Sequence, residues 1–179
     1  MDNIDEPISV VDYNAEWPLL FSVEAERIRI GIDEPITGIE HVGSTSVAGM
    51  SGKPIVDLLL GVASMEQAHK VAEQVAQLGY ENLGEVFVPG RVYLRRREEY
   101  NYNVLIVIFE GELWHYFVLL RDYLRRNPDE VEAYSQSKRS AVESGAITFL
   151  SYSQEKGPFL KALAERAIAW HQDNVKQKS

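Results

Sequence analysis

The 179-residue chain contains no cysteine, which excludes disulfide bonds, thiolate nucleophiles and cysteine-ligated metal sites. It also lacks a run of about 18 apolar residues, the length that a membrane-spanning helix requires. The segment at its start, MDNIDEPISV, does not have the basic stretch followed by an apolar one that marks a secretory signal. We therefore expect a cytoplasmic protein with no membrane partner.

Basic residues are scarce as well. The chain has 18 Lys and Arg against 27 Asp and Glu, which gives a formal net charge of -9. A protein with this charge does not attract nucleic acid or anionic membranes nonspecifically. We therefore expect no nucleic-acid partner, and any phosphate-binding site has to collect its basic residues locally.

The order of apolar segments predicts an α/β (α+β) fold. We expect strands at 8–11, 39–42, 55–62, 86–88, 92–97 and 101–109, and helices at 15–31, 64–78, 113–126, 129–143 and 152–175. The run 55–62 is almost wholly apolar, as in a strand covered on both faces. Because the links between the later strands are short, the sheet should be mixed or antiparallel.

The chain is expected to form a single domain over residues 1–179. The strands fall in a sheet-containing core at 1–111, and the pattern from 112 to 179 is helical throughout. No internal repeat, low-complexity stretch or linker isolates the second part. We therefore interpret 112–179 as a helical cap that does not fold independently.

Small and hydroxylated residues follow the strand expected at 39–42. Gly43 has no Cβ, so backbone amides at this turn can approach an anion closely, and the hydroxyls of Ser44 and Thr45 can donate hydrogen bonds to it. Turns of this composition are also common without a ligand. His41, just before the turn, either donates to a phosphate or holds the turn in place.

Asp57 is the acidic residue of the apolar run 55–62. A carboxylate inside such a strand is costly unless a cation, a metal or several donors satisfy it. Mg²⁺ prefers oxygen ligands and would bridge Asp57 to phosphates held at the preceding turn. The alternative is a buried, hydrogen-bonded carboxylate with a structural role.

Basic and amide side chains on the later strands are further candidates. Arg91, Arg95 and Arg97 alternate with Tyr93 and should share one strand face, from which they can contact phosphates or pair with acidic residues. Lys53 precedes the strand that carries Asp57. Alternation also places Asn101 and Asn103 on one face of the next strand.

The segments 41–47 (HVGSTSV) and 52–57 (GKPIVD) together resemble the GrpB family, whose members are grouped with the nucleotidyltransferase superfamily by fold. Further matching segments are 17–21 (WPLLF) and 120–125 (LRDYLR), so the resemblance covers nearly the whole chain. It implies a nucleotidyltransferase-like mixed sheet flanked by helices, with a helical C-terminal half. In active superfamily enzymes, two or three carboxylates at this site bind two divalent metals.

The sequence departs from that pattern at two places. The residue two positions after Asp57, on the same strand face, is Leu59 instead of a second carboxylate. Where many family members carry a His-x-His pair, this chain has Asn101 and Asn103, which cannot transfer protons near neutral pH. Glu40, Glu98 and Glu99 are conceivable replacement carboxylates, although solvated surface positions are the favoured explanation for all three.

The resemblance implies a Mg²⁺-dependent nucleotidyl- or phosphoryltransferase that binds a nucleoside triphosphate, or another phosphate-bearing small molecule, in a cleft between the turn and Asp57. Asp57 would be both the metal-binding and the catalytic residue. The expected ligand-binding residues are Gly43, Ser44, Thr45, Lys53, Arg95, Arg97, Asn101 and Asn103. The alternatives are a catalytically weak or inactive nucleotide-binding or regulatory module of the same fold, and a protein-interaction protein. Enzymatic activity, the acceptor and the oligomeric state stay open.

Overall fold

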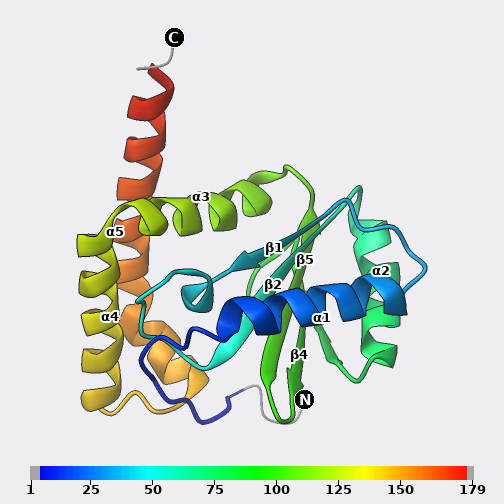
Figure 1. Ribbon diagram of the computed structural model, residues 1–179, viewed down its shortest axis with the longest axis horizontal. Coiled ribbons are helices and arrows are strands. Elements are labelled where there is room, and N and C mark those ends of the chain that lie inside the picture. Colours follow the sequence, from blue (N-terminus) through cyan, green and yellow to red (C-terminus); the bar gives the residue numbers. More distant parts are fainter. Residues whose placement is uncertain (1–4, 177–179) are drawn as a thin grey trace. The chain divides into compact units, whose positions relative to one another are not determined.

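The computed structural model describes residues 5–176 and has a mixed α/β architecture (Figure 1). In chain order the elements are α1 (Trp17–Gly31), β1 (Gly38–Val42), the 3₁₀ turn η1 (Ser44–Ser46), β2 (Ile55–Val62), α2 (Met65–Gln77), β3 (Glu81–Gly84), β4 (Val92–Arg97), β5 (Asn101–Ile108), α3 (Glu112–Arg126), α4 (Pro128–Glu143) and α5 (Phe149–Lys176). The prediction of a mixed sheet flanked by helices, with a helical C-terminal half, is confirmed. No helix within residues 5–176 combines the length and apolar character that a membrane span needs.

The described residues form two compact units that are interleaved in the sequence. Residues 14–46 and 55–118 make up the sheet unit, whereas residues 5–13, 47–54 and 119–176 make up the helical unit. The chain therefore passes between the units several times, and α3 contributes its first turns to the sheet unit and its remainder to the helical unit. The expectation of one domain with a core at 1–111 and a dependent cap at 112–179 stays a prediction.

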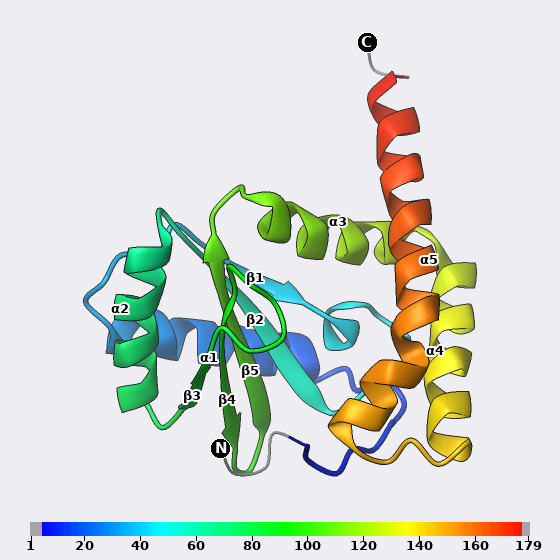
Figure 2. The same cartoon turned by 180° about the vertical axis from the view of Figure 1, so that it is seen from behind.

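The five strands lie in the order β1-β2-β5-β4-β3. β2 and β5 run parallel at the centre, and the remaining neighbours pair antiparallel. Helices α1 and α2 cover one face of this sheet, so the strands lie behind α1 in Figure 1 and in front of it in Figure 2. β2 is buried along nearly its whole length, as its apolar sequence predicted.

A pair of glycines makes room for aromatic rings on the other face of the sheet. Gly38 of β1 lies directly opposite Gly61 of β2. A Cβ at either position would come within 2.8 Å of both the Phe109 ring and the Trp114 indole. Since real Cβ contacts are longer, the glycine pair is what allows Trp114, at the start of α3, to pack on β1 and β2.

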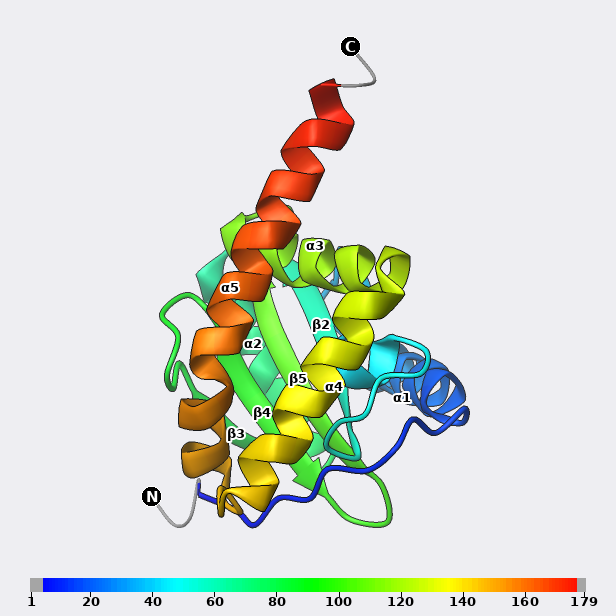
Figure 3. The same ribbon diagram turned by 90° about the vertical axis from the view of Figure 1, so that its left-hand side faces the viewer.

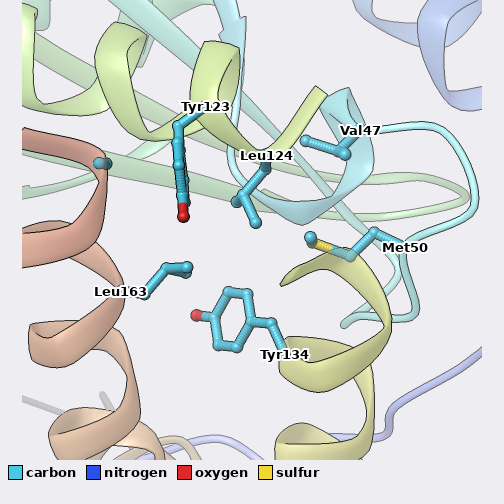
Figure 4. Packing of buried hydrophobic residues seen from close by; sticks show 7 residues of the cluster. Val47, Met50, Tyr123, Leu124, Tyr134 and Leu163 are labelled. Atoms are coloured by element: carbon cyan, nitrogen blue, oxygen red, sulfur yellow. The ribbon is translucent and has the colours of Figure 1, made fainter. Parts of the chain in front are cut away.

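The helical unit has a core of its own, with α4 and α5 packed side by side (Figure 3). Figure 4 shows its centre, where side chains from α3, α4 and α5 meet two from the segment 47–54. The labelled residues are Val47, Met50, Tyr123, Leu124, Tyr134 and Leu163. The segment is also tied to α4 by Lys138, which is 1% exposed and whose Nζ donates to the Ser51 carbonyl at 2.8 Å.

Two expected strands are wrong. Residues 8–11 do not form an edge strand: Pro7 and Val11 make only isolated bridges, to Thr148 and Gly52. Residues 86–88 form a tight turn in which the Val88 amide donates to the Val86 carbonyl, and the third strand of the sheet is instead β3. β3 escaped prediction because its sequence, ENLG, has no apolar alternation; it is an edge strand with two exposed residues.

Candidate functional site

The turn after β1, residues 43–46, is here termed the Gly-Ser turn. It begins at Gly43, whose φ of 71° lies in the left-handed region that favours glycine. The chain then makes one 3₁₀ turn over Ser44–Ser46, and the Ser46 hydroxyl donates to the Gly43 carbonyl at 2.6 Å. This bond fixes the direction in which the backbone leaves the strand.

His41 contacts the Gly-Ser turn and helix α1. Its Nε2 lies 2.9 Å from the Thr45 Oγ1, and its imidazole stacks on the Phe21 ring of α1 at a centroid distance of 4.7 Å. His41 and Thr45 are both buried. The Thr45 side chain therefore contributes by holding the turn, whereas Ser44, which is half-buried, sits nearer the surface.

Asp57 lies directly against this turn. β1 and β2 pair so that Val42 is opposite Asp57, which brings the next residue, Gly43, onto the carboxylate. A Cβ added to Gly43 would overlap Asp57 Oδ2 and lie 3.0 Å from Asp57 Cγ. Glycine is thus required here both by the backbone conformation and by the closeness of Asp57.

A hydrogen-bond network connects Asp57 to the neighbouring strands. Asn103, opposite Asp57 on β5, donates from Nδ2 to Asp57 Oδ1 at 2.7 Å. The Asn103 Oδ1 accepts from the Tyr93 hydroxyl and from Arg97 NH2, each at 2.9 Å. Arg97 also donates to the Tyr102 carbonyl at 2.8 Å, which fixes its guanidinium in place.

This network assigns a role to Asn103. Its oxygen is occupied by two donors and its amide nitrogen faces a carboxylate, so neither atom is placed as a metal ligand. A buried amide with all these partners instead orients the Asp57 carboxylate. Asn103 therefore positions the Asp57 carboxylate in this chain.

Arg91 adds a second positive charge on the same face. Its guanidinium lies 5.6 Å from the centroid of the Tyr93 ring, and NH2 donates to the Val86 carbonyl at 3.3 Å. Burial lowers the pKa of Arg91, while the charges of Tyr93 and Asp57 act in the opposite direction. Arg91 and Arg97 thus bring two guanidinium groups to this face of the sheet, although the chain as a whole is acidic.

The other expected ligand-binding residues are placed differently. Arg95 of β4 is opposite Asn103 of β5, but its Nε donates to the Glu81 carboxylate of β3 at 2.7 Å. Asn101 begins β5, on the same face and beside Arg97. Lys53 belongs to the helical unit, where its Nζ lies 4.5 Å from the Phe149 ring centroid. The site assembled in the sheet unit therefore comprises the Gly-Ser turn, Asp57, Asn103, Tyr93, Arg97 and Arg91.

The residues present do not fit a two-metal centre. Leu59 is fully buried, and within residues 5–176 no group of three or more Asp, Glu or His side chains is arranged to hold a metal. Glu40 is opposite Leu59, hence on the same face as Asp57. A single Mg²⁺ is compatible with Asp57, because Mg²⁺ often takes one or two carboxylates and completes its coordination with phosphates and water.

Tyr93 belongs to this site although the sequence did not predict it as a ligand-binding residue, and Arg91 joins it although it was expected only as one possible phosphate contact. The alternation Arg91, Tyr93, Arg95, Arg97 correctly placed all four on one face. It did not show that Tyr93 and Arg97 share the oxygen of Asn103, because that depends on the pairing of β4 with β5. A search for polar residues at alternate positions on adjacent strands would have found them.

Comparison with known proteins gives a match to the model of the GrpB protein family over residues 7–166. The UPF0157 protein YqkA of Bacillus subtilis is 30% identical, over 91% of this chain and 48% of YqkA, so the chain spans about half the length of that relative. Glutamate-rich protein GrpB of Alkalihalophilus pseudofirmus is 29% identical, over 86% of this chain and 91% of the relative. The crystal structure of GrpB from Enterococcus faecalis superimposes with a TM-score of 0.83 at 28% identity, covering 92% of this chain and 99% of that one.

Proposed function

This chain belongs to the GrpB family, and we propose that it binds a nucleoside triphosphate, or another phosphate-bearing small molecule, as a Mg²⁺ complex at the Gly-Ser turn. The observation that carries this proposal is the approach of Gly43 to Asp57, since it puts a glycine-initiated turn, which is suited to an anion, beside a carboxylate, which is suited to a cation. A metal-phosphate complex needs both kinds of group at once.

The phosphates are proposed to lie against the Gly-Ser turn. Its backbone amides and the Ser44 hydroxyl are suited to donate to phosphate oxygens, as glycine-initiated turns do. Arg97 supports this placement, because Asn103 bridges the two side chains: it accepts from Arg97 and donates to Asp57. Arg95 and Asn101, on the same face, are proposed as outer contacts to the ligand.

Mg²⁺ is proposed to bind Asp57 as its protein carboxylate. When bound, the ion would neutralise phosphate charge and link the phosphates to β2. Asn103 orients the Asp57 carboxylate by donating to Oδ1. The remaining coordination positions are left for phosphate oxygens and water.

The site favours binding over rapid group transfer. A second metal would require a further carboxylate at the position of Leu59, and proton transfer from an acceptor would require a base where Asn103 stands. We therefore infer a nucleotide-binding module whose transferase activity, if present, is slow. Catalysis would show itself as release of pyrophosphate or inorganic phosphate from the bound triphosphate.

Thermal melting with a panel of nucleoside triphosphates tests the proposal, because a ligand that binds only the folded state raises its stability. At a ligand concentration of 100 times the Kd the gain is about 2.7 kcal/mol, equivalent to a rise in Tm of roughly 5–10 °C for a protein of this size. The rise should require Mg²⁺ and disappear with a chelator. The absence of any Mg²⁺-dependent shift across the panel would contradict the proposal.

A further inference from the structure

Phe87 has a backbone conformation that is unfavourable for its side chain. Its φ is 66°, in the left-handed region, and 55% of the residue is exposed to solvent. A bulky non-glycine residue in this region is strained, and such strain often accompanies a functional constraint. Exposing an aromatic ring adds a hydrophobic cost. Two unfavourable features thus coincide at one residue.

The strained conformation is held by the loop that carries it, residues 85–91, here termed the β3–β4 loop. The Val88 amide donates to the Val86 carbonyl at 2.8 Å, on either side of Phe87. The Glu85 carboxylate closes the loop by accepting from the Gly90 amide at 2.8 Å. These bonds fix the backbone that directs Phe87 outward.

The β3–β4 loop is anchored to the residues around Asp57. Val86 packs on the same apolar cluster as Tyr93, and its carbonyl accepts from Arg91. Arg91 in turn lies over the ring of Tyr93, whose hydroxyl bonds Asn103. Figure 2 shows the loop in front of the sheet, on the face away from α1 and α2. Phe87 therefore stands on a loop that is bonded, through Arg91 and Tyr93, to the residues around Asp57.

We propose that Phe87 stacks on the nucleobase of the ligand, so that the site recognises a nucleoside triphosphate and discriminates against inorganic polyphosphate. This inference rests on the proposed phosphate binding at the Gly-Ser turn. An aromatic ring stacks on every base because each base has a π-face, and this contact strengthens binding without selecting one base. Arg91 and Arg97 hold the phosphates, and Phe87 supplies the contact that a bare polyphosphate lacks.

The test measures the affinities of MgATP, MgGTP and Mg-tripolyphosphate by calorimetric titration, for the unchanged protein and for Phe87→Gly, Phe87→Leu and Phe87→Trp. Phe87→Gly removes the ring and suits a positive φ, so it should not lower Tm. It should weaken binding of both nucleotides about 5- to 150-fold, the range that base stacking contributes, and leave tripolyphosphate unaffected. Phe87→Leu should behave like Phe87→Gly in binding, and Phe87→Trp should retain nucleotide affinity.

The outcomes separate this inference from the function on which it rests. If the unchanged protein binds tripolyphosphate as tightly as MgATP, or if Phe87→Gly weakens all three ligands equally, the stacking role is wrong and the phosphate site stands. If MgATP binds to the unchanged protein but tripolyphosphate does not, the phosphate site is wrong, and the stacking inference that rests on it is wrong as well. Binding of none of the three ligands contradicts both.

Discussion

Gly43 and Asp57 are so close that a methyl group on Gly43 would overlap the Asp57 carboxylate. The two residues lie on adjacent antiparallel strands, and the pairing of Val42 with Asp57 sets their distance. The sheet register therefore determines the site, and changes at either residue should have effects that differ from those of ordinary turn or strand substitutions.

Gly43→Ala should lower the free energy of unfolding by about 2–5 kcal/mol, because the positive φ and the overlap with Asp57 each add a cost. Gly49→Ala is the matched control: its φ of 78° is equally unfavourable, but a Cβ there meets no atom within 4 Å. The control should lose about 1–2 kcal/mol. Urea unfolding compares the two variants, and equal losses would show that the approach to Asp57 is unimportant for stability.

Asn103→Asp should make stability strongly dependent on pH. The new carboxylate would replace an amide that donates to Asp57 Oδ1 at 2.7 Å, and repulsion would raise the pKa of one member of the pair above its unfolded value. Since the folded state then binds more protons than the unfolded state, stability falls as pH rises above about 4.

Melting curves at pH 5 and pH 8, with and without Mg²⁺, measure this effect. Mg²⁺ should restore much of the stability that Asn103→Asp loses at pH 8, because the cation offsets the paired charges. Asn101→Asp is the control, since Asn101 lies on the same strand beside Arg97 and opposite Ile55 instead of Asp57. An Asn103→Asp protein as stable at pH 8 as at pH 5 would argue against the observed contact.

Glu24→Ala should be among the most destabilising changes in the sheet unit. Glu24 is 2% exposed and accepts from Arg27, Tyr80 and Arg96, the last at 2.8 Å. Removing it leaves the nearly buried Arg96 with only the longer, exposed pair to Glu98 at 3.7 Å, and breaking a buried ion pair typically costs about 3–5 kcal/mol. Glu26→Ala, on the same helix, removes only an exposed pair with Arg29 at 3.7 Å and should have no measurable effect. Similar unfolding curves for the two variants would contradict this assignment.

Most of the fold followed from periodicity. β4 was predicted with its observed bounds, and the helix expected at 64–78 is α2, whose N-cap Ser64 accepts at Oγ from the Gln67 amide at 3.2 Å. β3 was missed because polar edge strands are specified by their neighbour and not by their own residues. That error had a consequence for the site, since Arg95 pairs with Glu81 of the missing strand.

Only part of the site was predictable from the sequence. Glycine and a lone carboxylate are visible in the sequence because each breaks an expected pattern, and the structure brings Gly43 and Asp57 together as the sequence indicated. The network of Tyr93, Asn103 and Arg97 depends on strand register, which a pattern of residues on separate strands does not specify. Phe87 was not recognised, because its strained φ has no signature in the sequence.

The most direct test of the account is a calorimetric titration of Asp57→Asn with MgATP and MgGTP, alongside the unchanged protein. Asparagine keeps the shape of the side chain and an oxygen that can accept from Asn103, so the fold should persist and thermal melts should confirm it. Losing the negative charge should weaken Mg²⁺-dependent nucleotide binding by about tenfold or more. Unchanged Mg²⁺-dependent affinity in the folded Asp57→Asn protein would contradict the central claim that Asp57 binds the metal of a metal-phosphate ligand.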